Sequence, residues 1–130
     1  MTEGIDPAGG LDTLLGIEHV ELDADRVVMR FEVRPELMQP FGLLHGGVHC
    51  SVVESAASLG GALWYGERGR VVGVSNHTNF LRAVSSGTLT AVATPIHRGR
   101  TQQLWLVEIA DSAGRAVARG EVRLANLPGD

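Results

Sequence analysis

The sequence predicts an α+β fold in which one long helix packs against an antiparallel sheet of about six strands. The chain has 130 residues, which is the usual size of a single domain. Residues 48–65 contain no proline, and their apolar residues recur at helical spacing. Six other segments alternate apolar and polar residues between turn-forming residues, a pattern typical of strands.

The first third of the chain predicts a tail, a short helix and a β-hairpin. Residues 1–9 are acidic and rich in small residues, so we expect a flexible tail followed by one domain over 10–130. Residues 11–15 suit a short helix that ends at Gly16. Segments 17–22 and 26–34 alternate around a turn at 23–25, and Pro35 ends the hairpin.

The long helix carries two different stripes. One is apolar and consists of Val48, Val52, Ala56, Leu59 and Leu63. The other is small or polar and consists of Gly47, Ser51, Glu54, Ser58 and Gly61. Glu54 is the only carboxylate of this helix, and burying such a charge is costly unless the protein uses it.

The last part of the chain predicts four strands in an antiparallel meander, over residues 71–82, 88–96, 101–110 and 116–125. The first of these strands is polar in its middle, at residues 75–79. One helix on one sheet leaves a face or an edge of the sheet uncovered, so we expect a homo-oligomer.

Composition excludes several classes of protein. A net charge of −4 provides no basic field for nucleic acid or anionic membranes. Cys50 is the only cysteine, which excludes an intramolecular disulfide and a cysteine-based zinc site. No signal peptide pattern and no membrane-length apolar run is present, so we expect a cytoplasmic protein. The histidines form no metal motif, and we expect neither a metal nor a cofactor.

The segment QPFGLLHGG at residues 39–47, followed by Glu54, resembles the hotdog-fold acyl-CoA thioesterases. It is most similar to the branch with hydroxybenzoyl-CoA, phenylacetate-pathway and proofreading thioesterases. The resemblance covers roughly residues 10–126, and it is weaker in the later strands. It implies a hotdog fold, in which the sheet wraps a central helix, and an acyl-CoA substrate. It also implies active sites at a dimer interface and a dimer of dimers, which is a homotetramer.

The resemblance also implies roles for individual residues. Glu54 would be the catalytic carboxylate, as nucleophile or as general base on water. The backbone N–H of Gly46 would polarise the thioester carbonyl and hold the oxyanion. Gln39 and His45 would lie beside that carbonyl, and Ser58 would hold the carboxylate or the water.

Helix geometry adds a constraint on the site. Gly46 and Glu54 are eight residues apart in the sequence, or roughly 12 Å along a helix axis. Both cannot reach one carbonyl from the same chain. We therefore expect Gly46 of one subunit to work with Glu54 of another across a two-fold axis.

Coenzyme A carries phosphates, which arginine binds well. The candidate residues are Arg82, Arg98 and Arg100, together with the backbone of Gly99. Close relatives have a histidine where this chain has Phe80, so the substrate preference of the siderophore-linked members does not transfer directly.

The other notable side chains suit structural positions. We interpret His49 and Cys50 as packing or interface residues, and His19 and His77 as histidines on strand surfaces. Trp64 and Trp105 suit the core or an interface.

The predicted function is hydrolysis of a CoA thioester with an aryl, arylacetyl or medium acyl group. A hydratase or dehydratase of acyl thioesters is the alternative enzyme, because hotdog folds host both. A non-catalytic acyl-CoA-binding module is the other alternative, and it would not need Glu54.

Overall fold

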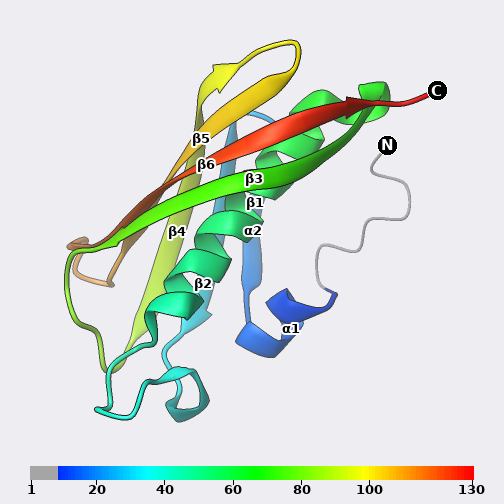
Figure 1. Cartoon of the computed structure of the whole chain (residues 1–130). Helices are drawn as coiled ribbons and strands as arrows, with labels where there is room; N and C mark the ends of the chain where they lie inside the picture. Colours follow the sequence, from blue (N-terminus) through cyan, green and yellow to red (C-terminus); the bar gives the residue numbers. More distant parts are fainter. Residues whose placement is uncertain (1–8) are drawn as a thin grey trace.

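A computed structural model describes residues 9–130, so the predicted tail at 1–9 lies almost entirely outside the described residues. The helices are α1 (Leu11–Leu15) and α2 (Gly46–Tyr65), with 3₁₀ turns η1 (Pro35–Leu37) and η2 (Gly66–Arg68). The strands are β1 (Glu18–Asp23), β2 (Arg26–Glu32), β3 (Gly69–Phe80), β4 (Thr88–Arg98), β5 (Gln102–Ala110) and β6 (Ala116–Pro128). Figure 1 shows α2 running along one face of the sheet, as the sequence predicts.

The six strands form one antiparallel sheet in the order β1-β2-β4-β5-β6-β3. The predicted hairpin of β1 and β2 is confirmed. The predicted four-strand meander is wrong in its first strand, because β3 pairs with β6 rather than with β4. Period-two alternation tells which face a strand buries but does not name its partner, so the sequence could not place β3 at the far edge.

The position of β3 determines where the next connection runs. Residues 81–87 must pass from the outer edge of the sheet to β4, which lies between β2 and β5. This connection reaches the N-terminal end of α2, where the N–H of Leu44 donates to the carbonyl of Val84 at 2.7 Å. A seven-residue loop thereby becomes one wall of a pocket.

The hydrophobic core lies between α2 and the sheet. Val52 and Ala56 of the predicted apolar stripe are fully buried, and Phe31 and Trp105 fill the space opposite. Trp105 is thus a core residue, one of the two positions that the sequence favours for it. Gly60 allows α2 to lie close to the sheet, because a Cβ at this position would be only 2.7 Å from the Trp105 ring.

Gly61 belongs to the small polar stripe of α2 but serves packing. A side chain there would collide with Leu124 of β6. The carbonyl of Gly61 accepts a hydrogen bond from the amide of Gln103 at 3.2 Å, and Trp105 Nε1 donates to Gln103 at 2.8 Å. Gln103 also donates to Asn126 at 2.9 Å. This network satisfies buried polar groups where helix and sheet meet.

His19 departs from its prediction as a surface histidine, whereas His77 is exposed as expected. The Nε2 atom of His19 is buried and lies 3.9 Å from a carboxylate oxygen of Asp12 in α1. Within residues 9–130, no helix is both long and apolar enough to cross a bilayer.

Candidate active site

The N-terminus of α2 is capped so that one N–H group stays free. His45 is exposed, and its Nδ1 accepts a hydrogen bond from the N–H of Gly47 at 2.8 Å. The N–H of Val48 donates to the carbonyl of His45 at 3.0 Å. The N–H of Gly46 has no acceptor among the described residues. The free N–H at the positive end of a 20-residue helix suits an anionic oxygen.

Phe80, the last residue of β3, covers Gly46. A Cβ built on Gly46 would lie 2.7 Å from the Phe80 ring, closer than real side chains approach one another. The ring therefore fits against this glycine because the glycine has no side chain. Phe80 remains 57% exposed, so its outer face is free to meet another molecule.

Glu54 lies two turns further along α2, half-buried and oriented by neighbouring polar groups. Its Oε1 accepts from the amide of Asn76 at 3.2 Å, and Ser58 Oγ lies 3.5 Å from Oε2, the upper limit for a hydrogen bond. Asn76 also donates to the carbonyl of Cys50 at 3.0 Å. Thr78 donates to the amide oxygen of Asn76 at 2.7 Å. These bonds aim the Asn76 donor at the carboxylate.

Gly73 of β3 leaves the space that the carboxylate occupies. A Cβ at Gly73 would overlap the Oε2 atom of Glu54. The pairing of β3 with β6 shifts register between Gly73 and Ser75, which marks a local irregularity at the same place. Strand β3 thus contributes both an oriented donor and a gap.

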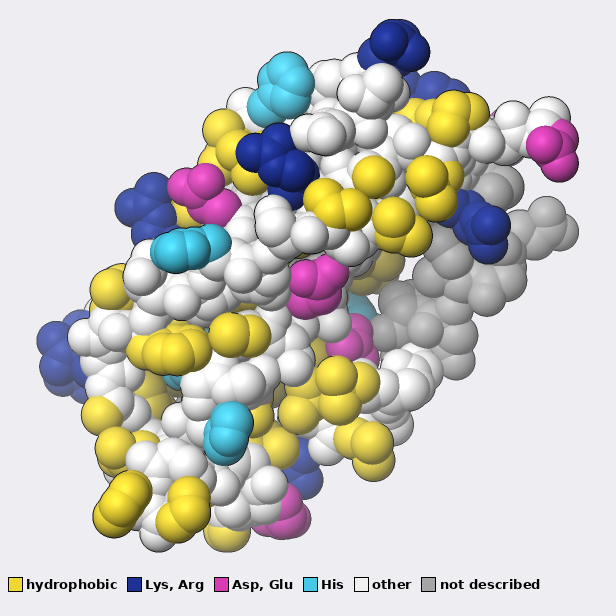
Figure 2. Space-filling view, in the orientation of Figure 1, with side chains coloured by type: hydrophobic (Ala, Val, Ile, Leu, Met, Phe, Trp, Pro, Cys, Tyr) yellow, Lys and Arg dark blue, Asp and Glu magenta, His cyan; other side chains and the backbone are white. Residues whose placement is uncertain are grey.

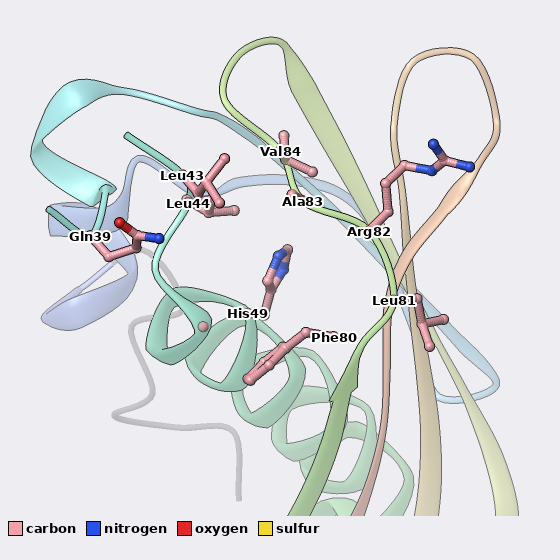
Figure 3. A pocket seen from close by; sticks show the side chains of 10 residues that line it. Gln39, Leu43, Leu44, His49, Phe80, Leu81, Arg82, Ala83 and Val84 are labelled. Atoms are coloured by element: carbon pink, nitrogen blue, oxygen red, sulfur yellow. The ribbon is translucent and has the colours of Figure 1, made fainter. Parts of the chain in front are cut away.

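A pocket of about 350 Å³ lies at the N-terminal end of α2. Its lining residues are Gln39, Leu43, Leu44, Gly46, His49 and the segment 80–84. Figure 3 shows Gln39 at one side of this space and Arg82 at the other, with the His49 ring between them. The side chain of Gln39 accepts from the N–H of Phe41, which closes the loop before the helix.

The predicted catalytic residues form two groups within the described chain. Gln39, His45 and Gly46 lie together where α2 begins. Glu54 and Ser58 lie together further along α2, and neither of them lines the pocket. The separation agrees with the spacing argument from the sequence.

The predicted CoA-binding residues are likewise divided. Arg82 lines a second, polar cavity of about 310 Å³, together with Ser85, Ser86, Asp111, Ser112 and Arg115 among others. Arg98, Gly99 and Arg100 lie at the opposite end of the 11-residue strand β4, roughly 35 Å away along the strand. The guanidinium of Arg98 already donates to Asp25 and to the carbonyl of Ala24, both at 2.9 Å.

Sequence reasoning missed Asn76, Gly73 and the pocket position of His49. The polar run at 75–79 was the available signal for Asn76, but only the pairing of β3 with the sheet shows which of its side chains faces Glu54. Among the described residues, no group of three or more His, Cys, Asp or Glu side chains could hold a metal ion.

Comparison with known proteins adds independent evidence. The model of the thioesterase superfamily matches residues 41–118. The crystal structure of AziG from S. sahachiroi superimposes with a TM-score of 0.92 at 53% identity, covering 93% of this chain and 98% of that one.

Two curated relatives have named activities. The 1,4-dihydroxy-2-naphthoyl-CoA hydrolase of Listeria monocytogenes is 34% identical, over 89% of this chain and 94% of its own length. The proofreading thioesterase EntH of Cronobacter turicensis is 38% identical, over 82% of this chain and 78% of its own length. The chain therefore belongs to the thioesterase superfamily, and it is a hotdog-fold hydrolase of acyl thioesters.

Proposed function

We propose that this enzyme hydrolyses an acyl-CoA thioester to the free acid and CoA, with Glu54 as its catalytic carboxylate. The observation that carries the proposal is the environment of Glu54. A carboxylate in the middle of a largely buried helix is held by Asn76 and given space by Gly73. A residue with only a packing role needs neither an oriented donor nor a reserved gap.

The proposed chemistry uses the two groups of residues in different ways. The Gly46 N–H donates to the thioester oxygen, which becomes negative as the carbonyl carbon is attacked. Glu54 either removes a proton from the attacking water or attacks the carbon itself and forms an anhydride that water then opens. In both routes the C–S bond breaks and the CoA sulfur leaves and is protonated. No cofactor takes part.

A second copy of the chain completes the proposed site. Strand β3 lies at an edge of the sheet over its 12 residues, which leaves one row of its backbone groups open for pairing. Val72 and Val74 of β3 are 45% and 54% exposed. Figure 2 shows hydrophobic side chains gathered in groups on the face along which β3 runs. These features support a dimer that joins Gly46 of one subunit to Glu54 of the other, and pairing of such dimers to a tetramer.

The charge of the cavity suggests where the CoA end of the substrate binds, and the named relatives suggest the nature of its acyl group. Arg82, in the polar cavity, suits the phosphates of CoA, and Arg98, Gly99 and Arg100 of a neighbouring subunit offer a further contact. The Listeria relative is named as a hydrolase of a naphthoyl-CoA, which favours an aryl or arylacetyl group over a long chain. Medium acyl groups remain in the proposed range.

The test is release of free thiol from a panel of CoA thioesters: benzoyl, hydroxybenzoyl, phenylacetyl, and short and long fatty acyl. We expect Glu54→Ala to lower kcat by about a thousandfold or more while circular dichroism shows an intact fold. Glu18→Ala, an exposed carboxylate on β1, is the matched control and keeps wild-type rates. Full activity in Glu54→Ala would remove Glu54 from the mechanism.

A further inference from the structure

His49 is the most deeply buried histidine among the described residues. None of the contacts described above explains why a histidine is buried at this position. It lies one turn after the start of α2 and is 3% exposed. Its Nδ1 atom is buried and has no hydrogen-bond partner among residues 9–130. Leaving such an atom unpaired costs stability, so an apolar residue of similar size would make the free protein more stable. The sequence interpretation of His49 as a packing residue leaves this cost unexplained.

The surroundings of His49 keep the ring neutral. Burial lowers the pKa of His49 to about 4 from the ordinary 6.5. Near neutral pH the ring therefore has one N–H donor and one nitrogen acceptor and no charge. The ring of Phe80 lies 5.9 Å away, centre to centre, and covers one side of it. A neutral ring with both a donor and an acceptor suits an amide or a hydroxyl better than a phosphate or a carboxylate.

His49 lies between the proposed binding sites for the two ends of the substrate, namely the phosphates and the thioester carbonyl. The two cavities share Arg82, Ala83 and Val84, so they are neighbours. Figure 3 shows the guanidinium of Arg82 turned away from His49, on the side away from Gln39. In a CoA thioester, the pantetheine arm with its two amides and one hydroxyl joins the phosphates to the thioester. Phosphates at Arg82 and a carbonyl at Gly46 leave the arm in the pocket that His49 lines.

We propose that His49 is a positioning residue for the pantetheine arm: when the arm enters the 350 Å³ pocket, the imidazole turns, and its Nδ1, which is shielded from solvent in the free chain, exchanges a hydrogen bond with an amide or hydroxyl of the arm. The inference rests on the proposed thioesterase function, which places the phosphates of the substrate at Arg82 and its thioester carbonyl at Gly46. The leucine and valine side chains around the ring pack on the methylene and methyl groups of the arm. Carrier proteins present the same arm as CoA, so both classes of substrate would use His49.

The test compares His49→Phe with His49→Asn in the full-length protein. Phenylalanine keeps an aromatic ring but removes both nitrogens, whereas asparagine places an amide near the position of Nδ1. Each variant is assayed with one acyl group on three leaving groups: CoA, pantetheine and ethanethiol. An acyl-carrier protein bearing that acyl group is the fourth substrate.

We expect His49→Phe to raise KM about fivefold to tenfold for the CoA, pantetheine and carrier-protein substrates. Turnover of the ethanethiol ester, which lacks the arm, stays within twofold of wild type. His49→Asn recovers most of the loss. The melting temperature of free His49→Phe is at least that of wild type, whereas a purely structural histidine would lose stability on replacement. A loss on CoA and pantetheine alone would exclude carrier proteins as users of the pocket and still support the proposal.

Two outcomes would overturn the proposal: an equal loss on all substrates, or no loss on any of them. Calorimetric binding of free CoA and of pantetheine keeps this test separate from that of the proposed function. If wild-type protein hydrolyses no thioester, weaker binding of both ligands by His49→Phe, restored in His49→Asn, still supports the role of His49. Unchanged binding in that case refutes it.

Discussion

At the residue scale, the site depends on a few side chains that orient other side chains. Glu54 is held by Asn76, and Asn76 is held by Thr78. At the helix start, His45 accepts from the N–H of Gly47, and the N–H of Gly46 has no acceptor within residues 9–130. The contacts at His45 are local in the sequence, whereas Asn76 reaches Glu54 from another element, 22 residues away. In the proposed mechanism each set of contacts orients a reactive group before the substrate arrives.

Removal of the Asn76 amide tests this orientation. We expect Asn76→Ala to lower kcat about tenfold with little change in KM, because one hydrogen bond to a charged group is lost after the substrate has bound. Steady-state kinetics with the best thioester of the panel measures both values. Asn79→Ala, an exposed asparagine on the same strand, is the matched control and stays within twofold of wild type. A tenfold rise in KM with unchanged kcat would instead place Asn76 in substrate binding.

At the scale of elements, strand β3 and helix α2 are fitted to each other. Gly73 of β3 makes space for Glu54 of α2, and Gly46 of α2 makes space for Phe80 of β3. The two glycines face in opposite directions across the same interface between strand and helix. Each gap exists only because β3 lies at the edge beside β6, and no local propensity of either segment requires it.

A double-mutant cycle separates packing from chemistry at Gly46. Gly46→Ala keeps the backbone N–H but pushes a methyl group into the Phe80 ring, so we expect kcat/KM to fall about tenfold or more. Phe80→Ala removes the obstacle, and the double variant should then match Phe80→Ala alone. The same thiol-release assay measures all four proteins. Additive losses would mean that the methyl group disturbs the site by a route other than Phe80.

Much of the element pattern was predictable from the sequence, and the reasons are local. Apolar spacing in α2 and alternation in β2 and β6 set those elements and their buried faces within a few residues. Gly16 ends α1 with φ of 73°, as a glycine after a helix is expected to do. The partner of β3, the burial of His49 and the Arg98–Asp25 pair were not predictable, because each joins segments far apart in the chain.

At the scale of the whole molecule, the proposed catalytic groups of one chain lie in two separate sets. Gln39 and Gly46 lie at one end of α2, and Glu54 lies further along the same helix. The open edge of β3 and its exposed valines give a second copy a place to pair. In the proposed dimer, two copies related by a two-fold axis would supply two equivalent sites, each with one set from either chain.

Mixing two inactive variants tests the shared site. Gln39→Ala and Glu54→Ala are each expected to be nearly inactive. After the two proteins are unfolded and refolded together in equal amounts, half of the random dimers are mixed, and each mixed dimer has one site without either change. We therefore expect about a quarter of wild-type activity to return. Each variant refolded alone is the control, and a mixture no more active than these controls would place all of the catalytic groups within one chain.

The sequence by itself determined the class of the fold and the long helix, because periodicity and turn chemistry act over short distances. The candidate residues of QPFGLLHGG with Glu54 came from the resemblance of that segment to a known family. Only the tertiary structure decided that β3 borders β6, that Asn76 rather than its polar neighbours reaches Glu54, and that the buried His49 lines a pocket. Those facts depend on which distant segments pack together. Packing is set by the fit of the whole core, since every strand and helix must bury its apolar face against the others at once.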